Sequence, residues 1–306
     1  MSETYEISAT AKINLYLRVC GTLSNGYHKL NTLMQEISLC DNVTVTVDDK
    51  RDHGILAITK GCKPIPNDKN LCYKAASKFF SALKKKEGIT DLPFVEITIE
   101  KNIPSEAGIG GGSSDAAAVI LSLSEHYDNP FSVEELNEIA AKTGADTPFF
   151  LYGGTCVCEG FGEIITKIGS LSGIPLILIK PKEGVSTPMC FASFDEQSSG
   201  DLDTSAYDDF KTALSGSETP VSIIQKNKDL LVNDLQIPAE NFVPDIRSAR
   251  ELLEKNGAEF AAMSGSGSCV FGIYETPEKR DLAFDKISSD SITSKKGFKL
   301  FKCETV

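Results

Sequence analysis

The chain has 306 residues, of which 41% are hydrophobic and 24% charged, and its formal net charge is −12. This length and composition are enough for a substantial buried core in one or two domains. The excess of acidic residues argues against nucleic acid as a partner, because an acidic protein repels a phosphate backbone and the basic run Lys84-Lys85-Lys86 suits the end of a helix.

Other features of the composition concern location and redox state. The stretch Met1–Ala11 lacks the pattern of a signal peptide, and no apolar run reaches the length of a membrane span. We therefore expect a cytosolic protein with no membrane partner. Nine cysteines, an odd number in mostly apolar surroundings, predict reduced and buried thiols. Cys156 and Cys158 would share one face of a strand, but no second cluster is near to complete a metal site.

The first half of the chain predicts alternating strands and helices. Apolar residues alternate with polar ones over 11–19, which indicates a strand and places Lys12 and Asn14 on the same face. After a turn at 21–26, the pattern predicts a strand at 43–47, a helix at about 68–87 and a strand at 95–99. A helix over 113–127 and a second one, opened by the capping box at Ser132, come next.

The second half predicts a different order. We expect a strand at 174–179, several helices, two strands flanking 265–267, a helix at about 278–287 and a last strand at 298–303. This order resembles a split β-α-β, ferredoxin-like arrangement with inserted helices. The segment 169–173 is the expected domain junction, which gives domains 1–168 and 169–306. The polar stretch 198–203 is an expected surface loop.

The strongest local signal is a glycine-rich run between a strand and a helix. It reads Pro104-Ser-Glu-Ala-Gly-Ile-Gly-Gly-Gly-Ser-Ser-Asp115. Glycines let the backbone turn its N–H groups toward an anion, and the helix dipole that follows favours a phosphate. The hydroxyls of Ser113 and Ser114 could contact phosphate oxygens or Mg²⁺. The run matches neither a P-loop nor G-x-G-x-x-G, and a flexible glycine turn before a capped helix is the alternative.

Two polar groups are candidates for proton chemistry. Asp146 lies in a short turn between Gly144 and Pro148, where aspartate is also an ordinary turn residue. Together with Lys12, it would form an acid–base pair that could remove the proton of a hydroxyl and offset the developing charge.

Two further motifs suggest ligand contacts. Tyr27 and His28 follow a turn and could stack on a nucleobase, although such a pair is usually only the flank of a turn. The second glycine cluster, 264–268, lies between two predicted strands. It is either a tight hairpin turn or a second approach of the backbone to a ligand.

With these residues in hand, the chain resembles the GHMP kinases, and within them the branch that acts on a cytidine-diphosphate-linked methylerythritol. The resemblance covers most of the chain. Its motifs are A-K-I-N-L at 11–15, N-G-Y-H at 25–28, N-L-x-x-K-A-A at 70–76, I-P-x-x-A-G-I-G-G-G-S-S-D-A-A at 103–117, G-A-D-x-P-F-F at 144–150, G-G-T at 153–155, V-S-T-P at 185–188, L-V-N-D-L at 231–235 and S-G-S-G-S at 264–268.

The resemblance implies an α+β fold, with an N-terminal domain like domain 2 of ribosomal protein S5, a ferredoxin-like C-terminal domain and an active site in the cleft between them. It implies an ATP-dependent, Mg²⁺-assisted transfer to an alcohol, with Asp146 as the base and Lys12 as its partner. The implied nucleotide-binding residues are Asn70 and Lys101 on the adenine side and Pro104, Ala107, Gly108, Gly110, Gly111, Gly112, Ser113 and Ser114 around the phosphates. The implied substrate-binding residues are Asn14, Tyr27, His28, Thr187 and Phe191, besides Asp146. The expected assembly is a monomer or a weak homodimer.

Two residues of the glycine run depart from the family's pattern. Glu106 stands where the family usually has glycine or another small residue, and a carboxylate near ATP would repel it unless the side chain turns away or meets Mg²⁺. Ile109 replaces the usual leucine, a change that conserves volume.

Other functions stay open at this point. A GHMP kinase for mevalonate, homoserine or a sugar would share the glycine run but would not need Tyr27, His28 and Phe191 to hold a cytosine. A nucleotide sensor on the same fold would have no need to keep both Lys12 and Asp146. A purely structural protein would explain neither set of residues.

Overall fold

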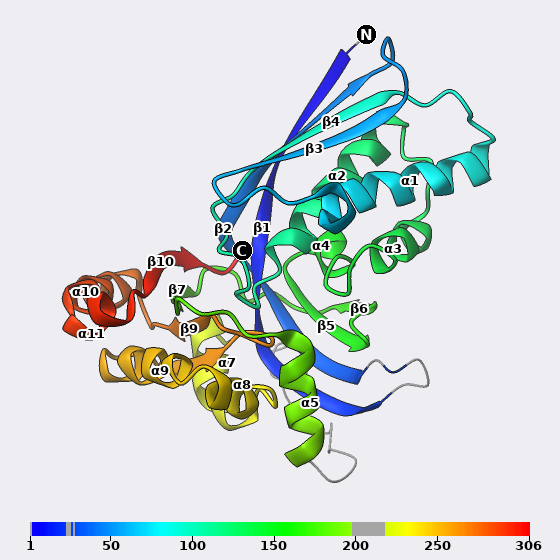
Figure 1. Cartoon of the computed structure of the whole chain (residues 1–306). Coiled ribbons are helices and arrows are strands. Elements are labelled where there is room, and N and C mark those ends of the chain that lie inside the picture. Colours follow the sequence, from blue (N-terminus) through cyan, green and yellow to red (C-terminus); the bar gives the residue numbers. More distant parts are fainter. Residues whose placement is uncertain (1, 23–25, 27, 198–217) are drawn as a thin grey trace. The chain divides into compact units, whose positions relative to one another are not determined.

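The structure is a computed structural model that describes residues 2–22, 26, 28–197 and 218–306 (Figure 1). It contains two compact units, each assembled from separate stretches of chain. Unit 1 comprises Met1–Ala11, Cys40–Ile103 and Gly110–Tyr152, and unit 2 comprises Lys12–Leu39, Pro104–Ile109 and Gly153–Val306. Two long strands, β1 (Ser2–Thr22) and β2 (His28–Asp48), contribute residues to both units. The predicted domain border at 168/169 stays a prediction.

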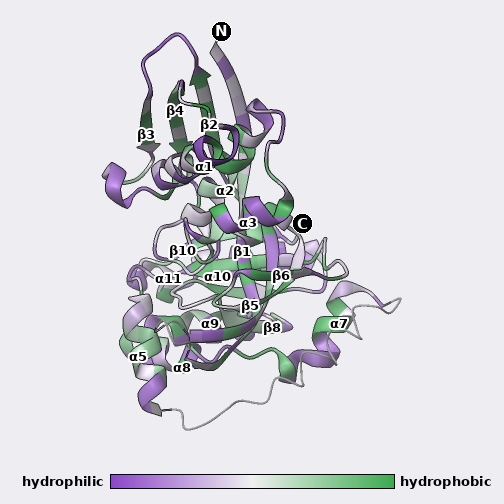
Figure 2. Cartoon of the chain, turned by 90° about the vertical axis from the view of Figure 1, so that its right-hand side faces the viewer, coloured by the Kyte–Doolittle hydropathy of each residue, from purple (hydrophilic) through white to green (hydrophobic). Residues whose placement is uncertain are grey.

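Unit 1 places helices against a sheet. Strand β4 (Phe94–Glu100) pairs with β3 (Gly54–Lys60) in parallel and with the second half of β2 in antiparallel orientation. The residues of β2 and β4 that face the core alternate along each strand, and hydrophobic colour marks this sheet in Figure 2. The core is completed by α1 (Leu71–Glu87) and α2 (Gly111–His126), which pack on each other, with α3 (Val133–Ala141) and α4 (Phe149–Tyr152) beside them.

Helix α1 illustrates how local sequence sets these elements. A short 3₁₀ turn (Asn67–Lys69) precedes it, and the side chain of Asn70 accepts a hydrogen bond from the backbone N–H of Cys72 and so caps its start. Gly88 ends the helix in a left-handed conformation. The buried residues Ala75, Phe79 and Leu83 recur every four positions and face the core.

Unit 2 contains two sheet segments. The first half of β2 pairs with β5 (Thr155–Gly160), which in turn pairs with β6 (Ile164–Lys167). A separate antiparallel sheet has the order β10-β7-β9-β8, formed by β7 (Pro175–Lys180), β8 (Phe260–Met263), β9 (Val270–Ile273) and β10 (Lys299–Glu304). With the strands numbered in chain order this is 4-1-3-2, so the predicted ferredoxin-like order is confirmed.

Helices complete unit 2. Helices α9 (Asp245–Lys255) and α10 (Pro277–Ser289) pack on the four-stranded sheet. The others are α5 (Thr187–Gln197), α7 (Pro220–Asn227), α8 (Gln236–Phe242) and α11 (Ser291–Lys296), with a 3₁₀ turn at Lys228–Leu230.

Most elements expected from the sequence are present. The capping box at Ser132 has both of its hydrogen bonds. Strands β1 and β2 extend well beyond the segments predicted for them, and β3 was not predicted. The expected loop at 198–203 and residues 23–25 of the expected turn at 21–26 lie outside the described residues.

The thiols agree with the prediction in part. All nine cysteines are free, but Cys20, Cys40 and Cys62 are only partly buried, which corrects the expectation of buried thiols throughout. Cys20 lies close to the end of β1 and Cys62 just after β3, while Cys40 lies within β2 at a position that the core covers only in part. In the part of the chain that the structure describes, no helix is long and apolar enough to cross a membrane.

Candidate active site

The first part of the glycine run, Pro104–Ile109, belongs to unit 2 and packs against the second glycine cluster. Gly108 has φ +71°, and a Cβ added to it would lie 2.2 Å from the carbonyl oxygen of Ser264. Gly265 faces Gly108 in the same way, since its added Cβ would lie 2.9 Å from the Gly108 oxygen. Only glycine allows this approach. The cluster at 264–268 therefore supports the glycine run and is more than a hairpin turn.

The rest of the glycine run belongs to unit 1 and opens helix α2. Gly110 is the N-cap residue in a left-handed conformation, and no side chain caps the helix. The free N–H groups at such a helix start, together with the helix dipole, favour an anion. Ser113 and the buried Ser114 lie in this first turn, as predicted. Within this unit the predicted phosphate-binding residues Gly110 to Ser114 thus lie together.

Asp146 lies in the same unit, on a turn beside this helix start. A Cβ added to Gly144 would lie 2.9 Å from the hydroxyl of Thr147 and 3.4 Å from that of Ser113. The turn that carries Asp146 therefore packs against the first turn of α2. Lys74 of α1 also holds this turn, because its ammonium donates to the carbonyl oxygen of Thr143 at 2.8 Å. Asp146 itself is half-buried.

Lys12 lies in the buried part of β1 in unit 2 and is only 2% exposed. Its ammonium donates to the side-chain oxygen of Asn14 at 2.6 Å and to the carbonyl oxygen of Gly108 at 3.0 Å. A buried ammonium is stable only with such partners. The structure thus brings Lys12, Asn14 and the glycine run together, as predicted. The pairing of Lys12 with Asp146 stays a prediction, since each residue is described within its own unit.

The predicted cytosine-binding residues are partly described. The rings of His28 and Phe191 stack at 4.5 Å between centroids, with 21° between their planes. The His28 Nε2 atom also lies 3.0 Å from the carboxylate of Asp195 on α5. Thr187, at the start of α5, shares a hydrogen bond of 2.7 Å with the hydroxyl of Ser266 in the second glycine cluster. Tyr27 lies outside the described residues.

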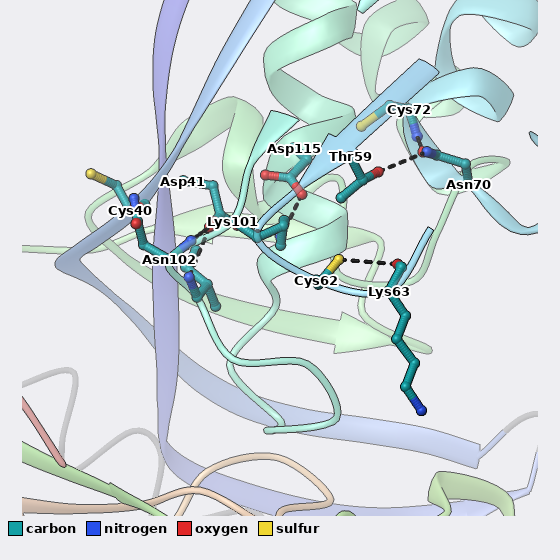
Figure 3. A network of polar contacts seen from close by, with 11 residues as sticks. Cys40, Asp41, Thr59, Cys62, Lys63, Asn70, Cys72, Lys101, Asn102 and Asp115 are labelled. Atoms are coloured by element: carbon teal, nitrogen blue, oxygen red, sulfur yellow. Dashed lines mark hydrogen bonds and ion pairs between the residues drawn. The ribbon is translucent and has the colours of Figure 1, made fainter. Parts of the chain in front are cut away.

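Lys101 and Asn70, the predicted adenine-side residues, belong to the polar network of Figure 3. The Lys101 ammonium contacts the carboxylates of both Asp41 and Asp115. Burial raises the pKa of Asp115, the nearby Lys101 opposes this shift and the charge of Asp41 adds to it, so that the pKa lies at about 7. Asn70 caps α1 and lies 3.5 Å from the hydroxyl of Thr59. The side chains of both predicted residues thus have structural partners.

Glu106 has a backbone conformation that explains the family's preference for a small residue. Its φ is +52°, in the left-handed region that favours glycine. Its side chain packs against Gly184, where an added Cβ would lie 2.7 Å from the Cβ of Glu106. Burial lowers the pKa of Lys180, and the charge of Glu106 is close enough to oppose part of that shift. The carboxylate is thus turned toward the segment after β7.

The side chains near the start of α2 indicate whether the site could bind Mg²⁺. Among the described residues, no three His, Cys, Asp or Glu side chains converge as a metal cluster. Mg²⁺ is usually held by one or two protein groups together with substrate phosphates and water. The hydroxyls of Ser113 and Ser114 at the start of α2 fit that limited role, so the residues present suit a metal that arrives with a nucleotide.

Several residues that shape the site were not predicted. Thr32 and Ser264 hydrogen-bond to Asn14, Asp41 and Asp115 contact Lys101, and Asp195 contacts His28. The Asn233 side chain donates to the carbonyl oxygens of Met263 and Gly265, which ties the L-V-N-D-L motif to the second glycine cluster. Thr32 could have been found, since it follows G-Y-H on a strand next to the one that carries Asn14, and Ser264 lies within a motif already singled out. Asp115 and Asn233 also lie in motifs already singled out, although those motifs do not identify their partners, whereas Asp41 and Asp195 are distant in sequence from the residues they contact.

The comparisons with known proteins agree with this geometry. The model of the GHMP kinases N terminal domain matches residues 70–154, and that of the GHMP kinases C terminal domain matches residues 221–292. A 4-diphosphocytidyl-2-C-methyl-D-erythritol kinase from Desulfitobacterium hafniense (strain Y51) is 38% identical over 277 residues, which cover 90% of this chain and 89% of that protein. The chain belongs to the 4-diphosphocytidyl-2-C-methyl-D-erythritol kinase family of GHMP kinases.

Solved structures support the same family. A crystal structure of a 4-(cytidine 5'-diphospho)-2C-methyl-D-erythritol kinase is 30% identical, with a TM-score of 0.73, and covers 98% of this chain and 99% of its own. A homoserine kinase from Cytophaga hutchinsonii has nearly the same TM-score, 0.72, and covers 99% and 95%, but it is only 18% identical and so shows the fold alone. The predicted family and α+β fold class are confirmed, with a sheet in each unit.

Proposed function

We propose that this chain transfers the γ-phosphate of ATP to the 2-hydroxyl of 4-diphosphocytidyl-2-C-methyl-D-erythritol, which gives the 2-phosphate and ADP. This is a step of the methylerythritol phosphate pathway of isoprenoid synthesis. The observation that carries the proposal is the contact of the Lys12 ammonium with the Gly108 carbonyl oxygen, 3.0 Å, which places a cation at the glycine run. A catalytic cation beside a phosphate-binding loop suits phosphoryl transfer.

The glycine run would hold the triphosphate. Gly110, Gly111 and Gly112 lead into the uncapped start of α2, where backbone N–H groups and the helix dipole offset phosphate charge. Ser113 and Ser114 would contact phosphate oxygens or Mg²⁺. When bound, Mg²⁺ would offset the charge on the transferred phosphoryl group. Pro104 and Ala107 would shape the loop, while Asn70 and Lys101 would lie toward the adenine.

The transfer itself needs an activated hydroxyl in line with the γ-phosphorus. Asp146 would accept the hydroxyl proton while the new P–O bond forms and the bond to ADP breaks. Lys12 would stabilise the developing charge, and Asn14 would position both Lys12 and the substrate. The packing of the Asp146 turn against Ser113 supports this role, because it places that turn beside the start of α2, where the phosphates would bind.

The cytidine end of the substrate would bind at His28 and Phe191, with Tyr27 as a further contact and Thr187 near the substrate. The stacked rings of His28 and Phe191 lie 4.5 Å apart, and a base inserted between them would need roughly 7 Å, two stacking distances. The base would therefore either separate the two rings or stack on an outer face. We further propose that the protein acts in the cytosol, as a monomer or a weak homodimer.

Product analysis tests this proposal. The purified chain, MgATP and 4-diphosphocytidyl-2-C-methyl-D-erythritol should give ADP and a new phosphate monoester, which phosphorus NMR would place on the tertiary 2-hydroxyl carbon. A product phosphorylated at another hydroxyl, or ADP formed without any new ester, would contradict it.

A further inference from the structure

A buried ionic cluster lies at the base of the glycine run. The Lys101 ammonium lies 2.6 Å from an Asp115 carboxylate oxygen and also contacts Asp41 (Figure 3). The side chains of Lys101, Asp41 and Asp115 are 10%, 0% and 5% exposed. The three residues come from different elements, since Asp41 is on β2, Lys101 follows β4 and Asp115 is in α2.

The cluster joins the two ends of the glycine run. On one side, the second oxygen of Asp41 accepts hydrogen bonds from the backbone N–H groups of Asn102 and Ile103, at 2.5 and 2.8 Å. On the other side, Asp115 is the fifth residue of α2. Lys101 bridges the two carboxylates and so connects the residues before the run with the helix after it. All of these residues belong to unit 1.

The ionic cluster also contacts the first residue of α2 directly. A Cβ added to Gly111 would lie 2.8 Å from the Ile103 side chain and 3.3 Å from the Lys101 ammonium. The first residue of α2 therefore packs on both the cation and the segment that Asp41 holds. A change in the cluster would shift the N–H groups that face a phosphate.

Stability alone does not explain this cluster. It buries two carboxylates with one ammonium, and the Asp115 Oδ1 atom is buried with no hydrogen-bond partner among the described residues. Buried ion pairs seldom add stability over apolar packing, and a buried polar atom without a partner lowers the free energy of unfolding. A cluster that costs stability and joins both ends of a loop is suited to fixing that loop.

We propose that Asp115 and Asp41, joined by Lys101, are positioning residues that fix the glycine run for the nucleotide's phosphates. The Lys101 side chain then acts through its two carboxylates and not as a ligand of the adenine. This inference rests on the proposed function, since it requires that the run binds a triphosphate. It predicts that breaking the cluster weakens phosphate binding whether or not a base is attached.

Asp115→Ala tests the positioning role most directly. It cuts the connection to α2 but leaves Lys101 with Asp41 as a one-to-one pair, so no buried charge is left without a partner. The measurements are the KM for MgATP and the inhibition constant of inorganic tripolyphosphate, which lacks a base. The KM and the inhibition constant should rise by a similar factor, on the order of 10-fold. This is the size of effect expected when a hydrogen bond to a charged group is lost. Asp115→Asn keeps an acceptor for Lys101 and should restore most of the loss.

Ser122→Ala is the matched control. Ser122 is buried on the same helix, and its hydroxyl donates to the carbonyl oxygen of Ala118 at 2.9 Å. This variant should leave both constants unchanged. Thermal unfolding of each variant would verify that it is folded under the assay conditions. If Asp115→Ala is not folded, the same two constants are measured for Asp115→Ser, which also removes the carboxylate.

The outcomes separate the two proposals. A rise in the KM for MgATP without a change in tripolyphosphate inhibition would overturn the positioning role, because it would point to the adenine side. Unchanged constants in a folded Asp115→Ala chain would also overturn it, as would tripolyphosphate that fails to inhibit a wild-type chain that turns over ATP. If the wild-type chain does not use ATP at all, the proposed function itself is wrong, and this inference with it.

Discussion

The Lys12 ammonium lies 2.6 Å from the side-chain oxygen of Asn14, and Thr32 fixes the orientation of that amide. The Thr32 hydroxyl has one proton, which it donates to the Tyr16 carbonyl oxygen at 2.6 Å. It must therefore accept from the Asn14 NH₂ group, at 2.8 Å, which leaves the Asn14 oxygen for Lys12. A buried threonine thus controls where the proposed catalytic ammonium points.

Thr32→Val should test this control. The variant keeps the side-chain shape but removes both hydrogen bonds, so the Asn14 amide can turn and Lys12 can move. We expect turnover to fall by about 10- to 100-fold, the size of effect that small misplacements cause. Thr32→Ser keeps the hydroxyl and should retain turnover. If steady-state kinetics gave equal turnover for Thr32→Val and Thr32→Ser, the orientation would not matter.

Asp146→Asn should separate proton removal from nucleotide binding. The amide keeps the size of the side chain but cannot accept the proton of the substrate hydroxyl. General-base action is typically worth roughly 100- to 10,000-fold, so turnover should fall by that order. The affinity for ATP, measured by calorimetry, should stay close to that of the wild type. Near-normal turnover would remove Asp146 from the mechanism.

Glu106→Gly should relieve backbone strain. Glu106 has φ +52°, and a side chain in the left-handed region costs about 1–2 kcal/mol. We expect the free energy of unfolding, measured in urea, to rise by up to about 1 kcal/mol, because added flexibility of the unfolded chain offsets part of the gain. Loss of a negative charge from the run proposed to bind ATP should also lower the KM for ATP by a small factor, because it removes a weak repulsion.

Asp128→Gly is the control for that experiment. Asp128 is also acidic, has φ +54° and is exposed at the end of α2. The Asp128→Gly variant should raise the free energy of unfolding without changing the KM for ATP. A higher KM for ATP in Glu106→Gly would instead mean that the carboxylate assists binding, for example through Mg²⁺.

Phe191→Leu should weaken binding of the cytidine substrate. The variant removes the ring that stacks on His28 and keeps an apolar side chain of moderate size. Base stacking on an aromatic ring is worth about 1–3 kcal/mol, so the KM for the substrate should rise by roughly 5- to 100-fold. Phe194→Leu, on the same helix, is the matched control and should change it little. An equal rise in both variants would indicate a general change in α5 and not a loss of stacking.

The sequence predicted the elements with strong periodicity and the residues within continuous motifs. The apolar alternation around Lys12, the capping box at Ser132 and the glycine run all have local causes, and the structure contains each of them. Strand β3 was missed because its weak alternation leaves Leu56 and Ile58 partly exposed on an edge strand.

The contacts that organise the site were harder to predict. Asp41 and Asp115 are 60 and 14 positions from Lys101, and Asp195 is 167 positions from His28. Nothing local in the sequence marks such pairs, because they depend on the register of strands and on how helices pack. The resemblance to the GHMP kinases assigned Lys101 to the nucleotide, and that role stays a prediction; the structure adds two carboxylate partners for its ammonium.

Acceptor preference tests the central claim most directly. The purified chain would be given MgATP with 4-diphosphocytidyl-2-C-methyl-D-erythritol, mevalonate, homoserine or galactose, and the rate of ADP release would be measured for each. We predict that the cytidine-diphosphate compound has by far the highest kcat/KM and that the other three release ADP no faster than a reaction without acceptor. A higher kcat/KM for any of those three would contradict the account.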